Sequence, residues 1–237
     1  IYNAAREPEI VDLQALLRSM GARVNGAGGS IITVEGGAAL HGCTHRVIGD
    51  RIVCATYLCA AAAAGGEVRL TGVDYRAVST VALSLAESGC EVRSEADAVS
   101  LRSTGALRSV RPVRTAPYPG FPTDAQPVLM AALLRSEGCT VFVENIFENR
   151  YRHVDELSRM GAEIRVAGRV AVVNGVRTLH GAAVKCTDLR GGAALVIAGL
   201  SAEGTTRVTE LTHIDRGYDA IERDLATLGA QIRRETT

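Results

Sequence analysis

The sequence predicts an α/β fold made of repeated units, and two recurring phrases predict it. The first phrase is an amphipathic helix that ends at a glycine and leads into a short strand. It occurs four times, as LLRSMGARV (16–24), SLAESGCEV (84–92), LSRMGAEI (157–164) and LATLGAQI (225–232), and its glycines are 68, 72 and 68 residues apart. Glycine adopts the left-handed conformation that closes many helices, so each copy predicts a helix end followed by a strand.

The second phrase is a helix rich in Ala and Leu, followed by a glycine and a β-branched strand. Its three copies are ATYLCAAAAAGGEVRLTGV (55–73), VLMAALLRSEGCTVFVENI (128–146) and LVIAGLSAEGTTRVTEL (195–211). These helices are apolar on nearly every side, which predicts that they are buried, whereas the helices of the first phrase have one apolar face. Each unit therefore runs helix, strand, helix, strand, and two units add one more strand, at 98–103 and 170–175.

The spacing of the two phrases divides the chain. The glycine of the second phrase precedes the next helix-end glycine by 23, 23 and 25 residues, but no Ala-rich helix lies 23 residues before Gly21. Residues 49–237 thus form three whole units, and residues 1–48 form half of another. Half a unit cannot bury its own apolar face, so we expect a missing N-terminal portion or another chain to complete it.

Composition and charge exclude several classes of protein. Lys and Arg together number 26, as do Asp and Glu, so no net positive field favours nucleic acid. A hydrophobic content of 47% excludes a disordered chain. The longest apolar stretch, 53–64, is too short to cross a bilayer, so we expect no membrane partner. Six cysteines are too few for a disulfide scaffold and predict reduced thiols in a cytoplasmic protein.

Polar residues gather in four clusters beside the units, at 114–126, 144–153, 185–193 and 213–224. In the third cluster Asp188 and Arg190 precede two glycines and an apolar helix. A helix start with an arginine beside it suits an anion, although an internal Asp188–Arg190 pair explains the residues equally well. Asp124 also stands at a helix start, where it is either a functional carboxylate or only an N-cap.

Aspartates recur at Asp50, Asp124 and Asp188, each before an apolar helix. A quasi-symmetric array brings such helix starts toward one end of the molecule, where their positive ends favour an anionic substrate.

Other motifs give weaker indications of function. NGAGGS (25–30) lies between two strands and predicts a β-turn rather than a phosphate loop. His41, Cys43 and His45 share one face of an extended segment but lack a fourth ligand, so we expect no metal site. No cysteine has the neighbours that activate a nucleophile, and no cofactor is expected.

Long segments of the chain resemble the UDP-N-acetylglucosamine 1-carboxyvinyltransferase family of enolpyruvyl transferases. They are NAAREPEIVDL (3–13), YPGFPTDAQ (118–126), IFENRYRHVDEL (146–157), TDLRGGAALVIAGLSAEGTT (187–206) and HIDRGYDAIERDL (213–225). The resemblance covers essentially the whole chain and implies the C-terminal portion of such an enzyme. It implies an inside-out α/β barrel of βαβαββ repeats, with 49–237 as one three-repeat domain and 1–48 as the end of a catalytic domain.

The resemblance also implies a reaction and its residues. The family transfers the enolpyruvyl group of phosphoenolpyruvate to the 3-hydroxyl of UDP-N-acetylglucosamine, the first committed step of peptidoglycan precursor synthesis. That step serves cell-wall biogenesis, cell shape and cell division. The residues that match catalytic positions are Asp124, which would take the hydroxyl proton, Asp188, Arg190 and Arg216. Those that match substrate-binding positions are Asp124, Ile146 through its backbone, Arg150 and Glu7.

Several departures from the family pattern limit this expectation. The catalytic Cys-bearing loop and a Lys–Asn pair of the family match nothing in this sequence, so we expect the chain to be inactive alone. Val53 and Ala55 stand where the family favours Glu and Gly. Two alternatives remain open: the sister enzyme that acts on shikimate 3-phosphate, and a non-catalytic binding or regulatory module of the same fold.

Overall fold

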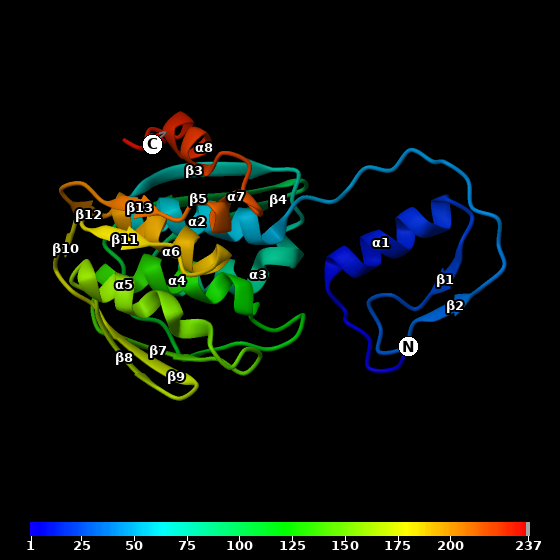
Figure 1. Ribbon diagram of the computed structural model, residues 1–237, viewed down its shortest axis with the longest axis horizontal. Coiled ribbons are helices and arrows are strands. Elements are labelled where there is room, and N and C mark those ends of the chain that lie inside the picture. Colours follow the sequence, from blue (N-terminus) through cyan, green and yellow to red (C-terminus); the bar gives the residue numbers. More distant parts are fainter. Residues whose placement is uncertain (236–237) are drawn as a thin grey trace.

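Three apolar helices form the centre of the protein, as the second phrase predicts. The computed structural model describes residues 1–235, and in it α2 (Arg51–Ala64), α4 (Gln126–Ala132) and α6 (Leu189–Leu200) pack against one another. Every residue of α4 is buried, as are residues 191–198 of α6. Sheets and outer helices cover most of the surface of these helices (Figure 1).

Strands surround the helices on the outside. The sheet of the first unit has the order β3-β5-β4, and that of the second has the order β6-β7-β9-β8. In both, the last strand of the unit, β5 or β9, lies between two strands and runs antiparallel to each of them. The strands are β3 (Gly66–Thr71), β4 (Glu91–Glu95), β5 (Ala98–Ser103), β6 (Val113–Arg114), β7 (Cys139–Val143), β8 (Glu163–Ala167) and β9 (Val170–Asn174).

The third unit is built differently from the first two. It contributes two short parallel pairs, β10 with β12 and β11 with β13. Their bounds are β10 (Leu179–His180), β11 (Ala183–Lys185), β12 (Ala202–Glu203) and β13 (Arg207–Thr209). Among residues 1–235 the strands thus form separate sheets outside the helices and do not close into one barrel. The α/β class, with helices inside and strands outside, is confirmed.

The predicted helix-end glycines all take the left-handed conformation. Gly21, Gly89, Gly161 and Gly229 have φ between 92° and 110°. The helices that they close are α1 (Pro8–Ser19), α3 (Tyr75–Glu87), α5 (Val154–Arg159) and α8 (Ile221–Thr227). Strands follow the first three glycines, but the strand expected after Gly229 is absent from residues 230–235, so that part of the prediction is wrong. β4 and β8 each pair with the strand that comes next in the chain, and residues 230–235 have no such neighbouring strand among the described residues.

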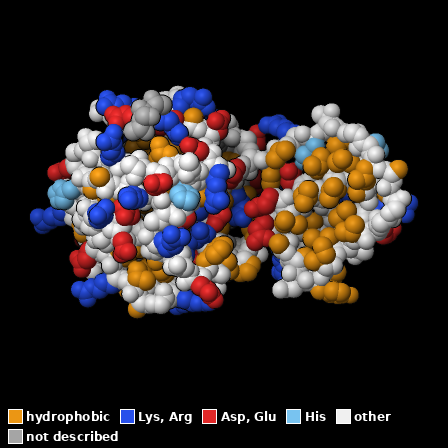
Figure 2. Space-filling model, in the orientation of Figure 1, with side chains coloured by type: hydrophobic (Ala, Val, Ile, Leu, Met, Phe, Trp, Pro, Cys, Tyr) orange, Lys and Arg blue, Asp and Glu red, His pale blue; other side chains and the backbone are white. Residues whose placement is uncertain are grey.

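Residues 1–48 lie to one side of the rest (Figure 1). They hold α1 and an antiparallel pair, β1 (Arg23–Asn25) and β2 (Thr33–Glu35), joined by the predicted turn at 26–30. No residue of α1 is buried. Large apolar side chains gather on this part of the surface (Figure 2). The most exposed are Tyr2 at 83%, Ile1 and Val47 at 71%, and Val34 at 60%.

None of the helices within residues 1–235 combines the length and the apolar character needed to cross a membrane.

Candidate active site

The starts of the buried helices meet at one end of the molecule, as the recurring aspartates predict. Asp50 caps α2 by accepting from the amides of Ile52 and Val53, at 2.8 and 3.0 Å. Asp188 caps α6 by accepting from the amides of Arg190 and Gly191, at 3.0 and 2.9 Å. Both caps satisfy amides that have no partner inside their helix. The amides at the start of α6 are therefore occupied by Asp188 and are not free for an anion, which corrects one expectation.

Asp124 stands at the third helix start and is not an N-cap. It lies inside a short 3-10 helix, η1 (Thr123–Ala125), that leads into α4. One carboxylate oxygen accepts from Arg150 at 2.5 Å, and the other accepts from Arg190 at 3.1 Å. The Asp124 side chain is 38% exposed, whereas the two arginines are 11% and 15% exposed. The two enclosed guanidinium groups can therefore donate to an anionic ligand in place of the half-open carboxylate.

Arg190 is aimed at Asp124 by a buried tyrosine. Its guanidinium donates to the Tyr218 hydroxyl at 3.5 Å and lies 5.9 Å from the centre of that ring. The same hydroxyl is 2.8 Å from the Thr56 hydroxyl on α2. Burial disfavours the charged form of Arg190, but Asp124 and Tyr218 outweigh it, so the pKa of Arg190 is raised. The Arg190 side chain therefore pairs with Asp124, and the Asp188–Arg190 ion pair is not formed.

Ile146 and Arg150 belong to one loop beside Asp124. Arg150 opens the 3-10 helix η3 (Arg150–His153), and its guanidinium lies 4.6 Å from the centre of the Phe147 ring. Ile146 is 42% exposed, and its amide donates to Glu144 at 2.9 Å. The Ile146 carbonyl is then the backbone group that this residue can offer to a ligand.

The remaining expected site residues lie at the edges of this cluster. Arg216 is exposed and follows α7 (Thr212–Asp215), which packs against the first turn of α6. It has no acidic partner within 4 Å among the described residues. Glu7 precedes α1, and its buried Oε2 has no hydrogen-bond partner among residues 1–235. The structure thus brings Asp124, Arg150 and Arg190 into contact. Among the described residues, neither Arg216 nor the Glu7 side chain makes a hydrogen bond to these three.

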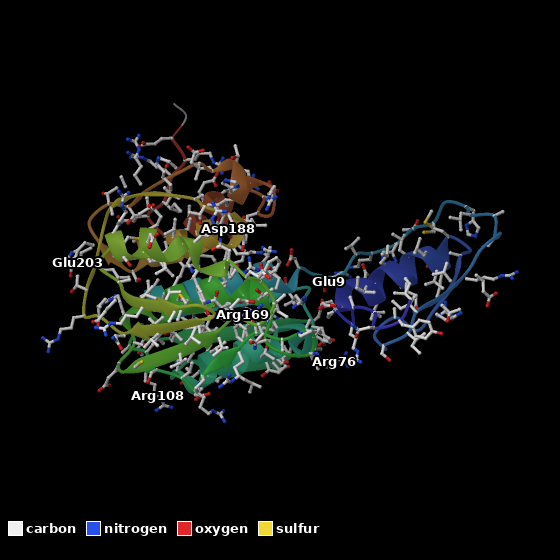
Figure 3. The ribbon with its side chains drawn as sticks, turned by 60° about the horizontal axis from the view of Figure 1, so that its bottom comes forward. Glu9, Arg76, Arg108, Arg169, Asp188 and Glu203 are labelled. Carbon is white, nitrogen blue, oxygen red and sulfur yellow. The ribbon has the colours of Figure 1, made fainter. Side chains whose placement is uncertain are left out.

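Glu9, which the sequence did not single out, connects α1 to this end of the molecule. Its carboxylate accepts from Arg51 at 3.0 and 3.2 Å. Arg51, at the first turn of α2, also lies 5.9 Å from the centre of the Tyr118 ring. Figure 3 shows Glu9 at the end of α1 nearest the larger part of the molecule, which carries Asp188. Residues 1–48 therefore approach the site through the start of α1.

Sequence reasoning gave three supporting residues no role. Glu144 and Tyr218 lie inside the polar clusters, and Thr56 lies inside the apolar stretch 53–64. A carboxylate directly after an apolar strand was the one signal that pointed to Glu144.

In the described part of the chain, no group of three His, Cys, Asp or Glu side chains is arranged to hold a metal ion.

Comparison with solved structures defines the class of protein. The enolpyruvyl transferase NikO from Streptomyces tendae matches with a TM-score of 0.83 and 30% identity, over 98% of this chain and 55% of its own. EPSP synthase from Acinetobacter baumannii has the same fold, with a TM-score of 0.72 and 19% identity over 94% of this chain and 54% of its own. The fold is thus that of the enolpyruvyl transferases. The sequence profile of EPSP synthase (3-phosphoshikimate 1-carboxyvinyltransferase) matches residues 1–225, and the chain belongs to that family.

Curated relatives within the family are more similar still. UDP-N-acetylglucosamine 1-carboxyvinyltransferase of Gluconacetobacter diazotrophicus is 53% identical over 99% of this chain and 56% of the relative. The enzyme of that name from Novosphingobium aromaticivorans is 50% identical, over 99% of this chain and 55% of the relative. These matches confirm the resemblance noted from the sequence. The chain spans about half the length of the curated relatives it matches.

Proposed function

We propose that this chain forms part of an enzyme that transfers the enolpyruvyl group of phosphoenolpyruvate to the 3-hydroxyl of UDP-N-acetylglucosamine. The observation that carries the proposal is the half-open Asp124 carboxylate held between Arg150 and Arg190. The identity of about 50% to relatives that bear this activity in their names supports the choice of acceptor. Solved EPSP synthases share only 19% identity, which supports shikimate 3-phosphate less well.

In this proposal Asp124 takes the proton of the attacking hydroxyl. A carboxylate within hydrogen-bonding reach of a hydroxyl is a suitable general base. Arg190 and Arg216 bind the carboxylate and phosphate of phosphoenolpyruvate, and their fixed positive charge stabilises the tetrahedral intermediate. Arg150 and the Ile146 carbonyl hold the nucleotide sugar, while Asp188 orders the start of α6, and Glu7 lines the cleft from the side of α1.

We further propose that residues 49–237 are one three-repeat domain and that residues 1–48 belong to a second, catalytic domain. The missing portion of that domain would supply the rest of the cleft, in the same polypeptide or as another chain. The reaction would take place in the cytoplasm, as part of peptidoglycan synthesis for cell shape and division.

Phosphate release tests the proposal. The chain is joined to the portion of the Gluconacetobacter diazotrophicus relative that it does not match, and we call this chimera the reconstituted transferase. We expect phosphate release from phosphoenolpyruvate with UDP-N-acetylglucosamine, and none from the 237-residue chain alone. Asp124→Ala should lower kcat at least about 100-fold, the usual contribution of a general base.

The intact relative serves as the positive control. If it turns over and the reconstituted transferase does not, the proposed activity of this chain is wrong. Turnover with shikimate 3-phosphate in place of the nucleotide sugar would support the sister activity. Full activity of the Asp124→Ala protein would remove the proposed base.

A further inference from the structure

A buried carboxylate lies behind the site and touches none of its charged groups. Glu144 follows β7 and is 1% exposed. Its Oε1 accepts from the Thr115 hydroxyl at 2.9 Å, the Ile146 amide at 2.9 Å and the Phe147 amide at 3.0 Å. The Thr123 hydroxyl lies 3.1 Å from both carboxylate oxygens.

These donors are all neutral. No Lys, Arg or His lies within 4 Å of Glu144 in the described part of the chain. A buried charge that lacks a cationic partner is stabilised only by such hydrogen bonds, and every donor that it uses is fixed in place. Removal of the carboxylate would leave two amides and two hydroxyls without an acceptor.

The donors belong to the elements that carry the proposed site. Thr123 precedes Asp124, and its hydroxyl oxygen also accepts from the Nε of Arg150 at 3.1 Å. Because the single proton of that hydroxyl points at Glu144, its lone pairs are left for Arg150. Arg150 can then direct its other nitrogen to Asp124. The hydrogen bond from the Ile146 amide to Glu144 orients the same loop. The Ile146 carbonyl accepts no hydrogen bond from residues 1–235.

The far side of the loop is held as well. The Glu144 amide donates to the Arg169 carbonyl at 2.8 Å, and the Arg169 guanidinium donates to the Asn145 carbonyl at 3.2 Å. Figure 3 shows Arg169 on the larger part of the molecule, away from Glu9. The loop is thus tied to the sheet behind it, and Glu144 connects that anchored backbone to the side chains in front.

We propose that Glu144 is a positioning residue, whose buried carboxylate sets the loop at 144–150 and, through Thr123, the Arg150–Asp124 pair for the nucleotide sugar. This inference rests on the proposed function and adds to it the group that holds the acceptor side of the site. A misplacement of about 1 Å in such a site can cost about 100-fold in rate, so the effect is measurable.

Amide hydrogen exchange on the 237-residue chain tests the proposal without any activity. Glu144→Ala should strongly speed exchange at Ile146 and Phe147, while Glu144→Gln should keep most of their protection, because its amide oxygen still accepts. Glu148→Ala is the matched control, since it removes an exposed carboxylate from the same loop. Unchanged exchange in Glu144→Ala, in a protein that remains folded, would overturn the inference.

Kinetics of the reconstituted transferase give the second test. Glu144→Ala should lower kcat/KM about 100-fold and raise the KM for UDP-N-acetylglucosamine while that for phosphoenolpyruvate stays within about twofold. Thr123→Val keeps the shape of the side chain and removes the hydroxyl that contacts both Glu144 and Arg150, while Glu144 can still accept from the two amides. We therefore expect kcat to fall about tenfold with the amides still protected. This variant tests the proposal even if Glu144→Ala does not fold.

The proposed function and the proposed role of Glu144 give different results when they fail. An inactive reconstituted transferase with the unchanged chain would count against the proposed function and leave the exchange result standing. An active one in which Glu144→Ala alters both KM values equally, or neither, would show that Glu144 only supports the fold.

Discussion

His153 should make the protein less stable as the pH falls, and the effect can be worked from its surroundings. The side chain is fully enclosed at the end of η3, and neither ring nitrogen makes a hydrogen bond of normal geometry within residues 1–235. A Cβ on Gly191 would lie 2.9 Å from the Cβ of His153, so the ring sits directly under the start of α6. Burial lowers the pKa of His153 from 6.5 to about 4, although the Asp188 carboxylate opposes the change.

The sign and size of the pH effect on stability follow from the difference between the pKa of His153 in the unfolded and the folded protein. Above pH 6.5 the ring is neutral in both the folded and the unfolded protein, so it contributes no pH dependence. Between pH 6.5 and about 4 the unfolded chain binds a proton that the folded protein does not, so the free energy of unfolding falls with pH. At 1.36 kcal/mol per pKa unit, the full loss is about 3 kcal/mol, reached near pH 4.

Urea unfolding of the wild type and of His153→Gln, at several pH values between about 7.5 and 4.5, measures this loss. Glutamine does not titrate, so the unfolding free energy of the wild type should fall relative to that of the variant as the pH falls. Carboxylates titrate alike in both and cancel. A difference that stays constant within about 0.5 kcal/mol over this range would refute the reasoning.

Three further substitutions test the capping and packing of the fold by urea unfolding. Asp188→Ala removes the cap of α6 and should cost about 1 kcal/mol; no loss would mean that water replaces the carboxylate. Leu58→Ala, at a position with 0% exposure in α2, should cost about 2 to 5 kcal/mol, and a value near zero would contradict the close packing of the central helices. Gly175→Ala places a Cβ 1.5 Å from the Ser136 carbonyl oxygen, so the backbone must move at a cost of about 3 kcal/mol, whereas a neutral result would exclude that contact.

Much of the fold could be predicted from the sequence because its signals are local. An apolar helix such as α6 is buried wherever it packs, and a glycine such as Gly161 closes a helix through its own backbone. The strand expected after Gly229 fails for the opposite reason. A strand needs a partner, and the local phrase does not contain one.

The site was predicted less completely, because contacts between distant residues make it. An aspartate at a helix start fits a cap and a ligand equally well, and Asp124 is separated from Arg150 by 26 residues and from Arg190 by 66. Tyr218 and Thr56 are 162 residues apart and were given no joint role for the same reason. The family resemblance pointed to the residues, and only the fold shows which of them touch.

The sparse attachment of residues 1–48 has a consequence for any unfolding experiment. α1 buries no residue, and the Glu9–Arg51 pair joins it to the helical centre, whereas every residue of α4 and residues 191–198 of α6 are buried. Segments with so few buried contacts open at a much lower free energy than the core does. A probe placed in α1 should therefore report an earlier transition than one in α6, and a two-state fit to either curve would describe only that part of the chain.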